Sequence, residues 1–199
     1  AGGLDAIRAE VPLRSLLAPA GSGIDDAAPC LAGQTWTWDR VRFTVLHPAP
    51  HFPYLANESS CVLRIDAAHG ALLLTGDIGD VIERRLVADA RAALRADVVF
   101  AGHHGSRHSS DPAFVAATGA RHVVFSTGHG NRHRHPAGEV KARWAAAGAE
   151  GWDTATAGAV TIRIEDGGID VHGRRDAVPR LWDAARIAGR SAGLSYRAD

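Results

Sequence analysis

Two short apolar runs, each ending at a residue type that binds metals, constrain the fold of this chain more than any other feature. Leu72–Leu74 is followed closely by Asp77, and Val98–Phe100 is followed closely by His103 and His104. A short apolar run next to glycine is typical of a strand that is buried on both faces. Because open α/β sheets bind ligands beyond the carboxyl ends of their strands, these three side chains are predicted to lie at one edge of a sheet.

A helix is predicted between the two runs. Ile82, Leu86, Ala90 and Leu94 recur every four residues, which places them along one helical face. Two simpler interpretations stay open, because an aspartate after a strand often caps a helix and a single histidine is more often structural than a ligand. Adjacent histidines in a glycine-flanked turn, however, do not help packing, which favours a metal site.

A third predicted strand, over residues 122–126, also ends at a polar turn. His129, Asn131, His133 and His135 crowd the stretch that follows it. One aspartate with several histidines and no cysteine is a ligand set for a borderline-hard divalent cation. A bridging carboxylate with imidazoles suits two such cations, which activate water and hold phosphate oxygens. Five further histidines are expected to be structural or at the surface: His47, His51, His69, His122 and His172.

The composition fits one domain without a strongly charged surface. The chain has 199 residues, 46% of them hydrophobic, with a formal net charge of +0 and a pI of about 7.4. Overall basicity therefore does not indicate nucleic-acid binding, and the excess of arginine over Lys141, the only lysine, is attributed to codon usage. No apolar run reaches the length of about 18 residues that predicts a membrane span. Neither a signal peptide nor a metal-motif spacing of Cys30 and Cys61 is present.

Short strands and helices alternate along the rest of the chain. No repeat or linker divides it, so one domain is predicted over residues 1–172, followed by a C-terminal helix and tail over residues 173–199. Hairpins are predicted over residues 34–46, 60–75 and 159–172. Helices are predicted over residues 3–11 and 177–188 and from Pro112 and Pro136 onward, a strand over residues 13–17, and loops over residues 19–29, 48–57 and 151–156.

Five motifs in a fixed order resemble those of the metallo-β-lactamase-like domain at the C-terminal end of the ComEC competence proteins, which are DNA-internalisation channels of bacterial inner membranes. The motifs occupy residues 57–63, 74–77, 99–106, 125–128 and 131–136, and Thr154 with Gly158 fits as well. The resemblance covers roughly residues 1–172 and is specific as a set, although each motif alone is weak. It implies an α/β fold of the αββα sandwich type.

The resemblance also implies roles for individual residues. Asp77 would bridge two divalent metal ions, manganese or zinc, and His135 would be the late histidine ligand. One of His103 and His104 would bind metal, while the other would contact phosphate or transfer a proton. The residues implied to help hold substrate are Ser106 and Asn131.

The implied activity is metal-dependent hydrolysis of phosphodiester bonds in the DNA strand that is not imported. Single-stranded DNA and the membrane-embedded channel region of the same parent chain would be the partners, with no small-molecule cofactor. The parent would lie in the bacterial inner membrane, with this domain soluble beside it. Local DNA affinity would come from Arg107, Arg132 and Arg134, although a solvated-loop role is equally open for each.

One feature of the family is missing. Its first metal motif, a His/Asp-rich turn, precedes a Gly-Gly-Leu segment, and Gly2-Gly3-Leu4 stands at the start of this sequence. We therefore expect an N-terminally truncated domain that lacks the first strands and about half of the metal ligands, is inactive alone, and leaves a sheet edge and an apolar face uncovered. The alternatives are another metallo-hydrolase of this fold, acting on a phosphoester or a lactone, and a non-catalytic degenerate module.

Overall fold

The computed structural model describes residues 3–178 and 180, and its centre is a mixed seven-stranded sheet in the order β3-β4-β5-β6-β7-β8-β9. Neighbouring strands are antiparallel from β3 to β6 and parallel from β6 to β9. The strands are β3 (Thr35–Trp38), β4 (Val41–His47), β5 (Val62–Ala67), β6 (Gly70–Leu74), β7 (Val98–Phe100), β8 (His122–Phe125) and β9 (Glu150–Asp153).

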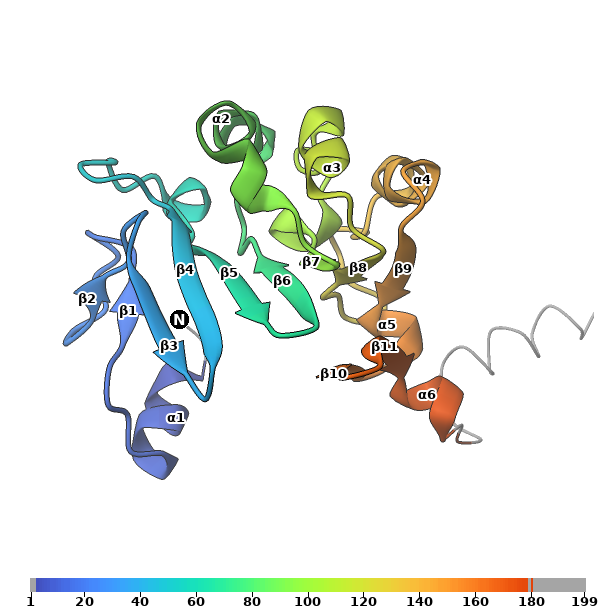
Figure 1. The fold of residues 1–199 in the computed structure, drawn as a ribbon, viewed down its shortest axis with the longest axis horizontal. Helices are drawn as coiled ribbons and strands as arrows, with labels where there is room; N and C mark the ends of the chain where they lie inside the picture. The colour runs from blue at the N-terminus through green and yellow to red at the C-terminus, as the bar shows by residue number, and fades with distance from the viewer. Residues whose placement is uncertain (1–2, 179, 181–199) are drawn as a thin grey trace, which may run out of the picture.

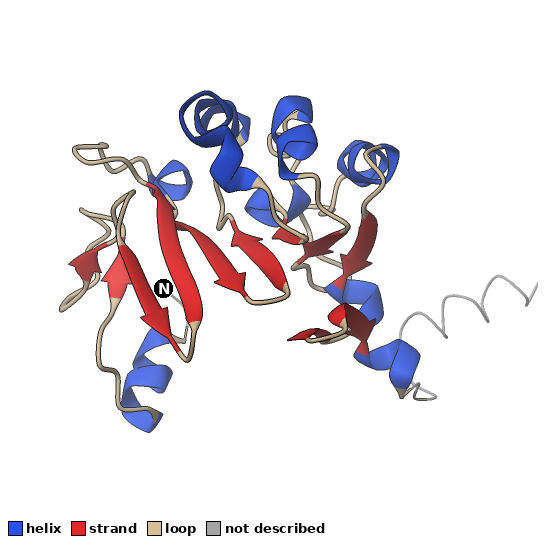
Figure 2. Ribbon diagram, in the orientation of Figure 1, coloured by secondary structure: helices blue, strands red, loops and turns tan. Residues whose placement is uncertain are grey.

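Helices cover one face of this sheet. In Figure 1, α2, α3 and α4 lie side by side over that face, and Figure 2 shows them as a single blue layer above the red strands. The helical segments along the chain are α1 (Leu4–Glu10), η1 (Ala56–Ser59), α2 (Asp80–Ala90), η2 (Arg91–Leu94), η3 (Gly102–Gly105), α3 (Pro112–Thr118), α4 (Gly138–Ala146), α5 (Thr154–Ala157) and α6 (Arg174–Ala177). Among the described residues, no helix has both the length and the apolarity that crossing a membrane requires.

The main core lies between the sheet and the helices. Leu73 from β6 and Phe125 from β8 pack there with Phe114 from α3 and Trp144 from α4, and each is almost fully buried. Burying one such side chain contributes about 1.5–3 kcal/mol to stability. Val140 and Trp144 are the buried residues of α4, so this helix packs against the core through them.

The opposite face of the sheet has a smaller cover. The antiparallel hairpin of β10 (Val160–Glu165) and β11 (Gly168–Gly173) packs against Val98 and Val124, so it covers the β7–β8 side of that face. A row of large apolar side chains continues beyond it across β6, β5, β4 and β3. The row consists of Leu72, Ile65, Phe43 and Trp36, which are paired strand by strand.

A disulfide joins Cys30 to Cys61, with 6.1 Å between the two Cα atoms. This Cα separation lies within the usual range for disulfides. Cys30 directly follows the short strand β2 (Ala28–Pro29), which pairs in parallel with β1 (Leu17–Ala18). Cys61 directly precedes β5, so the bond ties the small β1–β2 sheet to the large one.

Several predicted elements differ from those observed. Residues 151–156 were predicted as a loop, yet β9 and α5 occupy residues 150–157, because strand pairing with β8 organises this stretch. The strand predicted over residues 13–17 is only Leu17–Ala18, and the predicted loop 19–29 ends in β2. The helix predicted from Pro136 begins at Gly138, after an extended Ala137.

The predicted α/β class is confirmed, as are the three hairpins and the helix predicted from Pro112. Asp111 caps this helix, since its carboxylate accepts a hydrogen bond from the Ala113 N–H. The helix predicted over residues 177–188 lies almost wholly outside the described residues. The division between residues 172 and 173 stays a prediction.

Candidate metal and phosphoester site

The predicted site residues follow the carboxyl ends of three parallel strands. Leu74 of β6, Phe100 of β7 and Val124 of β8 are in register, so the segments that leave these strands start at one edge of the sheet. Asp77 follows the first strand, and the His103–His104 turn follows the second. The loop that carries His135 follows the third.

The four predicted metal ligands come together at this edge. His104 Nε2 lies 3.4 Å from Asp77 Oδ1, and both side chains are partly exposed. The His103 and His135 rings are 5.8 Å apart between centroids, and those of His103 and His104 are 6.4 Å apart. His135 is therefore on the same side of the sheet edge as the histidine pair.

The His103–His104 turn has an unusual backbone. His103 has φ 47° and ψ 43°, and His104 has φ 58° and ψ 20°, both in the left-handed region. That region costs roughly 1–2 kcal/mol for each residue with a side chain, and such costs are often found at functional sites. Hydrogen bonds hold the turn: the His103 N–H donates to the Gly76 carbonyl, and the Ser106 N–H donates to the His103 carbonyl, both at 3.0 Å.

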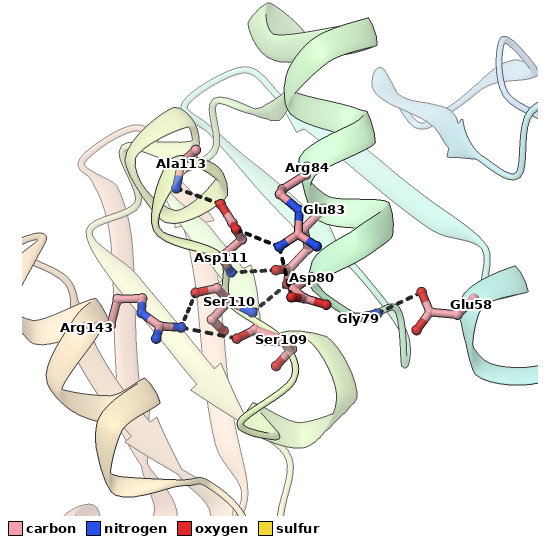
Figure 3. Close-up of polar contacts among 10 residues, drawn as sticks. All are labelled: Glu58, Gly79, Asp80, Glu83, Arg84, Ser109, Ser110, Asp111, Ala113 and Arg143. Carbon is pink, nitrogen blue, oxygen red and sulfur yellow. Dashed lines mark hydrogen bonds and ion pairs between the residues drawn. The ribbon is translucent and has the colours of Figure 1, made fainter.

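A buried carboxylate anchors the loop that follows this turn (Figure 3). Glu83 of α2 is fully buried, and it accepts hydrogen bonds from the backbone N–H groups of Ser110 at 2.8 Å and Asp111 at 2.6 Å. Arg143 of α4 donates to the Ser109 and Ser110 carbonyls from the other side. The loop after the histidines is thus fixed to two helices.

The same carboxyl group has a shifted pKa. Burial raises the pKa of Glu83 to about 7, the nearby carboxylates of Asp111 and Asp80 add to the rise, and the two backbone hydrogen bonds oppose it. Arg84 bridges Asp80 and Asp111, at 2.8 Å and 3.1 Å. No positive charge contacts Glu83 directly in the interactions shown in Figure 3.

The segment before β5 holds the backbone at and after Asp77 through hydrogen bonds. Ser60 Oγ accepts a hydrogen bond from the Asp77 N–H at 3.1 Å, and Glu58 Oε2 accepts one from the Gly79 N–H at 3.2 Å. Asn57 Nδ2 lies 3.4 Å from His103 Nε2. These contacts explain why motif residues 57–61 belong to the site, although the sequence assigned them no role there.

Asn131 shapes the loop that presents His135. Its side-chain amide donates to the Gly128 and His135 carbonyls, and its Oδ1 accepts from the His135 N–H at 2.9 Å. The His133 ring stacks on His135 at 5.7 Å. Burial lowers the pKa of His135, and the neighbouring His103 lowers it further. This environment favours the neutral imidazole, which is the form that binds metals.

A cavity of about 260 Å³ lies beside the site, lined by His104 and His135 but not by Asp77 or His103. Its lining residues are His104, Ser126, Thr127, Gly128, Asn131, His133 and His135. Ser106 is not among them: it is 5% exposed, and its Oγ accepts a hydrogen bond from the His108 N–H. The substrate-binding roles of Ser106 and Asn131 stay predictions.

The donors suit a divalent cation in chemistry but not in number. A carboxylate with imidazoles fits manganese or zinc, and both cysteines are held in the disulfide. Within residues 3–178 and 180, no group of three or more His, Cys, Asp or Glu side chains is arranged to hold one metal ion. The structure therefore brings Asp77, His103, His104 and His135 together, while their metal-binding roles stay predictions.

Comparisons with known proteins bear on this arrangement. No protein-family model matches the chain. Competence protein ComA of Neisseria gonorrhoeae is 34% identical over 168 residues, which cover 84% of this chain and 24% of that protein. The chain is homologous to the ComEC family of competence proteins.

Two further relatives have similar coverage. Recombination protein 2 of Haemophilus influenzae is 27% identical over 193 residues, or 96% of this chain and 24% of the relative. The uncharacterized protein YcaI of Escherichia coli is 27% identical over 181 residues, or 91% of this chain and 24% of the relative. The chain thus spans about a quarter of the length of these three relatives.

Proposed function

We propose that this chain contributes to a metal-dependent nuclease that hydrolyses phosphodiester bonds in DNA during uptake, on the strand that is not imported. The observation that carries the proposal is the meeting of Asp77, His103, His104 and His135 at one sheet edge beside a cavity of about 260 Å³. Relatives named for competence and recombination support DNA as the substrate.

Each residue of the site would have its own role. Asp77, His135 and one of the adjacent histidines would hold the cations, with further ligands from outside the described residues. Two bound cations, manganese or zinc, supply an activated water and neutralise charge on the phosphate. His104, which is partly exposed, lies 3.4 Å from Asp77 and lines the cavity, would accept or donate a proton there. Asn131 would keep His135 in position through its three hydrogen bonds.

The proposal includes the αββα sandwich of the metallo-β-lactamase fold. The row of Trp36, Phe43, Ile65 and Leu72 supports it, since a second sheet would pack on such a face. We also propose that the parent protein lies in the bacterial inner membrane, with this part beside it and in contact with single-stranded DNA.

A non-catalytic module is the second candidate. The observation that favours it is that the donors in the described part of the chain do not reach the three or more needed around one ion. A metallo-hydrolase of this fold acting on a small phosphoester or a lactone is the remaining alternative within the enzyme class.

Cleavage of labelled single-stranded DNA by the full-length gene product, with manganese added, tests the proposal. Asp77→Ala and His135→Ala should each lower the rate by roughly 10–100-fold or more, as is typical for disrupting a metal site. His129→Ala is the matched control, because His129 is an exposed histidine of the same loop that does not line the cavity. Wild-type cleavage that both site variants retain would contradict the mechanism.

A further inference from the structure

A second cavity adjoins the first. Its volume is about 350 Å³, and it shares the stacked pair His133 and His135 with the smaller one. The other residues that line it are Arg107, Arg134, Ala137, Gly138 and Glu139. The two cavities therefore lie on either side of one histidine pair, as neighbouring sites along a single surface.

The two arginines of this cavity are not used by the fold. Other arginines, such as Arg64, Arg84 and Arg143, are engaged in ion pairs or in hydrogen bonds to carbonyls. Arg107 and Arg134 are exposed, and neither makes a side-chain hydrogen bond or ion pair with any residue that the structure describes. Their two positive charges outweigh Glu139, the single carboxylate of the lining.

Both arginines lie on backbone segments that are held by hydrogen bonds. Arg107 lies between Ser106, whose N–H is bonded to the His103 carbonyl, and His108, whose N–H is bonded to Ser106 Oγ. The Arg134 N–H donates to the Asn131 carbonyl at 3.1 Å. Because guanidinium groups match phosphate oxygens in pairs of hydrogen bonds, two of them on ordered turns form a receptor for a phosphate.

We propose that the cavity lined by Arg107 and Arg134 binds the backbone phosphate next to the one positioned at the His104–His135 cavity. The ligand class is a single-stranded nucleic acid, and this assignment rests on the proposed nuclease function. A chain with successive phosphates is required, since only such a ligand reaches both cavities at once. The neutral net charge of the protein makes local arginines the source of phosphate affinity.

The test measures binding, which separates it from catalysis. The full-length gene product is titrated with a fluorescein-labelled thymidine oligonucleotide in chelator, over about 50–200 mM salt. The double variant Arg107→Gln/Arg134→Gln should bind roughly tenfold or more weakly. The slope of log affinity against log salt should become shallower by about 0.7 for each phosphate that the variant no longer neutralises.

Two variants control for charge and for folding. Arg91→Gln/Arg163→Gln removes the same number of charges from exposed arginines that line neither cavity, so it should change affinity little. Arg107→Lys/Arg134→Lys keeps both charges, so its salt slope should stay near that of the wild type. An equal loss of affinity in Arg91→Gln/Arg163→Gln would overturn the subsite in favour of general surface charge.

The outcomes distinguish this inference from the proposed function. Binding that is weakened only by the double variant supports the subsite even where manganese produces no cleavage, a result that would contradict the nuclease proposal alone. Unchanged affinity and salt slope in the double variant overturn the subsite, even where Asp77→Ala abolishes cleavage. A double variant that loses binding to anionic lipid vesicles and keeps DNA binding would also overturn it.

Discussion

A buried carboxylate links the candidate site to the protonation state of the core. Glu83 lies on the apolar face of α2 beside Ile82 and Leu86, and its two oxygens are taken up by the N–H groups of Ser110 and Asp111. A glutamate within an apolar helical stripe is the one sequence signal that could have identified it. The loop partners could not be identified, since they lie 27 and 28 residues further along the chain.

We expect Glu83 to make stability fall as the pH rises. Its pKa is about 7 in the folded protein against an ordinary 4.5, so the folded state binds the proton more tightly. Its contribution is therefore fully present below about pH 4.5 and is lost as the pH rises to about 7, by up to roughly 3 kcal/mol. Asp80 and Asp111 face the group, while Arg84 is paired with both of them.

Glu83→Gln tests this expectation, because glutamine cannot titrate. Urea unfolding of both proteins is compared at about pH 5 and about pH 8. From the lower to the higher pH, the free energy of unfolding should fall more in the wild type than in the variant. This holds even if the two proteins differ in stability at the lower pH. An identical pH dependence of the two proteins would show that Glu83 keeps one protonation state throughout.

The site residues show how much of the candidate site a single sequence can predict. Asp77, His103, His104 and His135 could be singled out because each follows a strand end, and register then brings those ends together. Ser60 and Asn57 received no role, since their contacts with Asp77 and His103 depend on how the segment before β5 crosses the sheet edge. Contacts between segments that are far apart in the chain depend on topology, so the local sequence pattern does not predict them.

At the scale of elements, strands with continuous apolar runs were predictable and edge elements were not. β7 and β8 are buried on both faces, and β6 is buried on one face and partly buried on the other, so their apolar composition identifies them. β9 is an edge strand with the sequence Glu-Gly-Trp-Asp, which contains no continuous apolar run. Such a stretch becomes a strand through its pairing with β8, which periodicity cannot show.

We expect the Cys30–Cys61 disulfide to stabilise the junction between the small and large sheets. The two residues are 31 apart in sequence, and closing such a loop contributes about 3–4 kcal/mol in the chain-entropy description. Denaturant unfolding with and without a reductant measures this. Reduction should lower the denaturant midpoint of the wild type. The midpoint of Cys30→Ala/Cys61→Ala should equal that of the reduced wild type and should not change when the reductant is added. A wild-type midpoint that reduction leaves in place would contradict the expected contribution.

At the scale of the whole molecule, the two faces of the sheet are unequally covered. Three helices bury one face, whereas the hairpin β10–β11 covers the β7–β8 side of the other (Figure 1). Trp36 stacks on Phe43 at 5.2 Å between ring centroids, and Trp38 at the end of the same edge strand is 70% exposed. An exposed edge strand with large apolar side chains favours association.

We therefore expect the isolated 199-residue chain to self-associate through β3. Trp38→Thr keeps a residue type that suits a strand and removes an indole that is already 70% exposed. The free energy of unfolding should therefore change by less than about 1 kcal/mol. Its sedimentation should show less association at high concentration than that of the wild type. Val81→Thr is the matched control, since Val81 is 61% exposed but lies on α2 in the helical layer. Equal association of the wild type and Trp38→Thr would place the associating surface away from this edge. If Val81→Thr lowered association as much as Trp38→Thr does, exposed apolar area anywhere on the molecule would have the same effect.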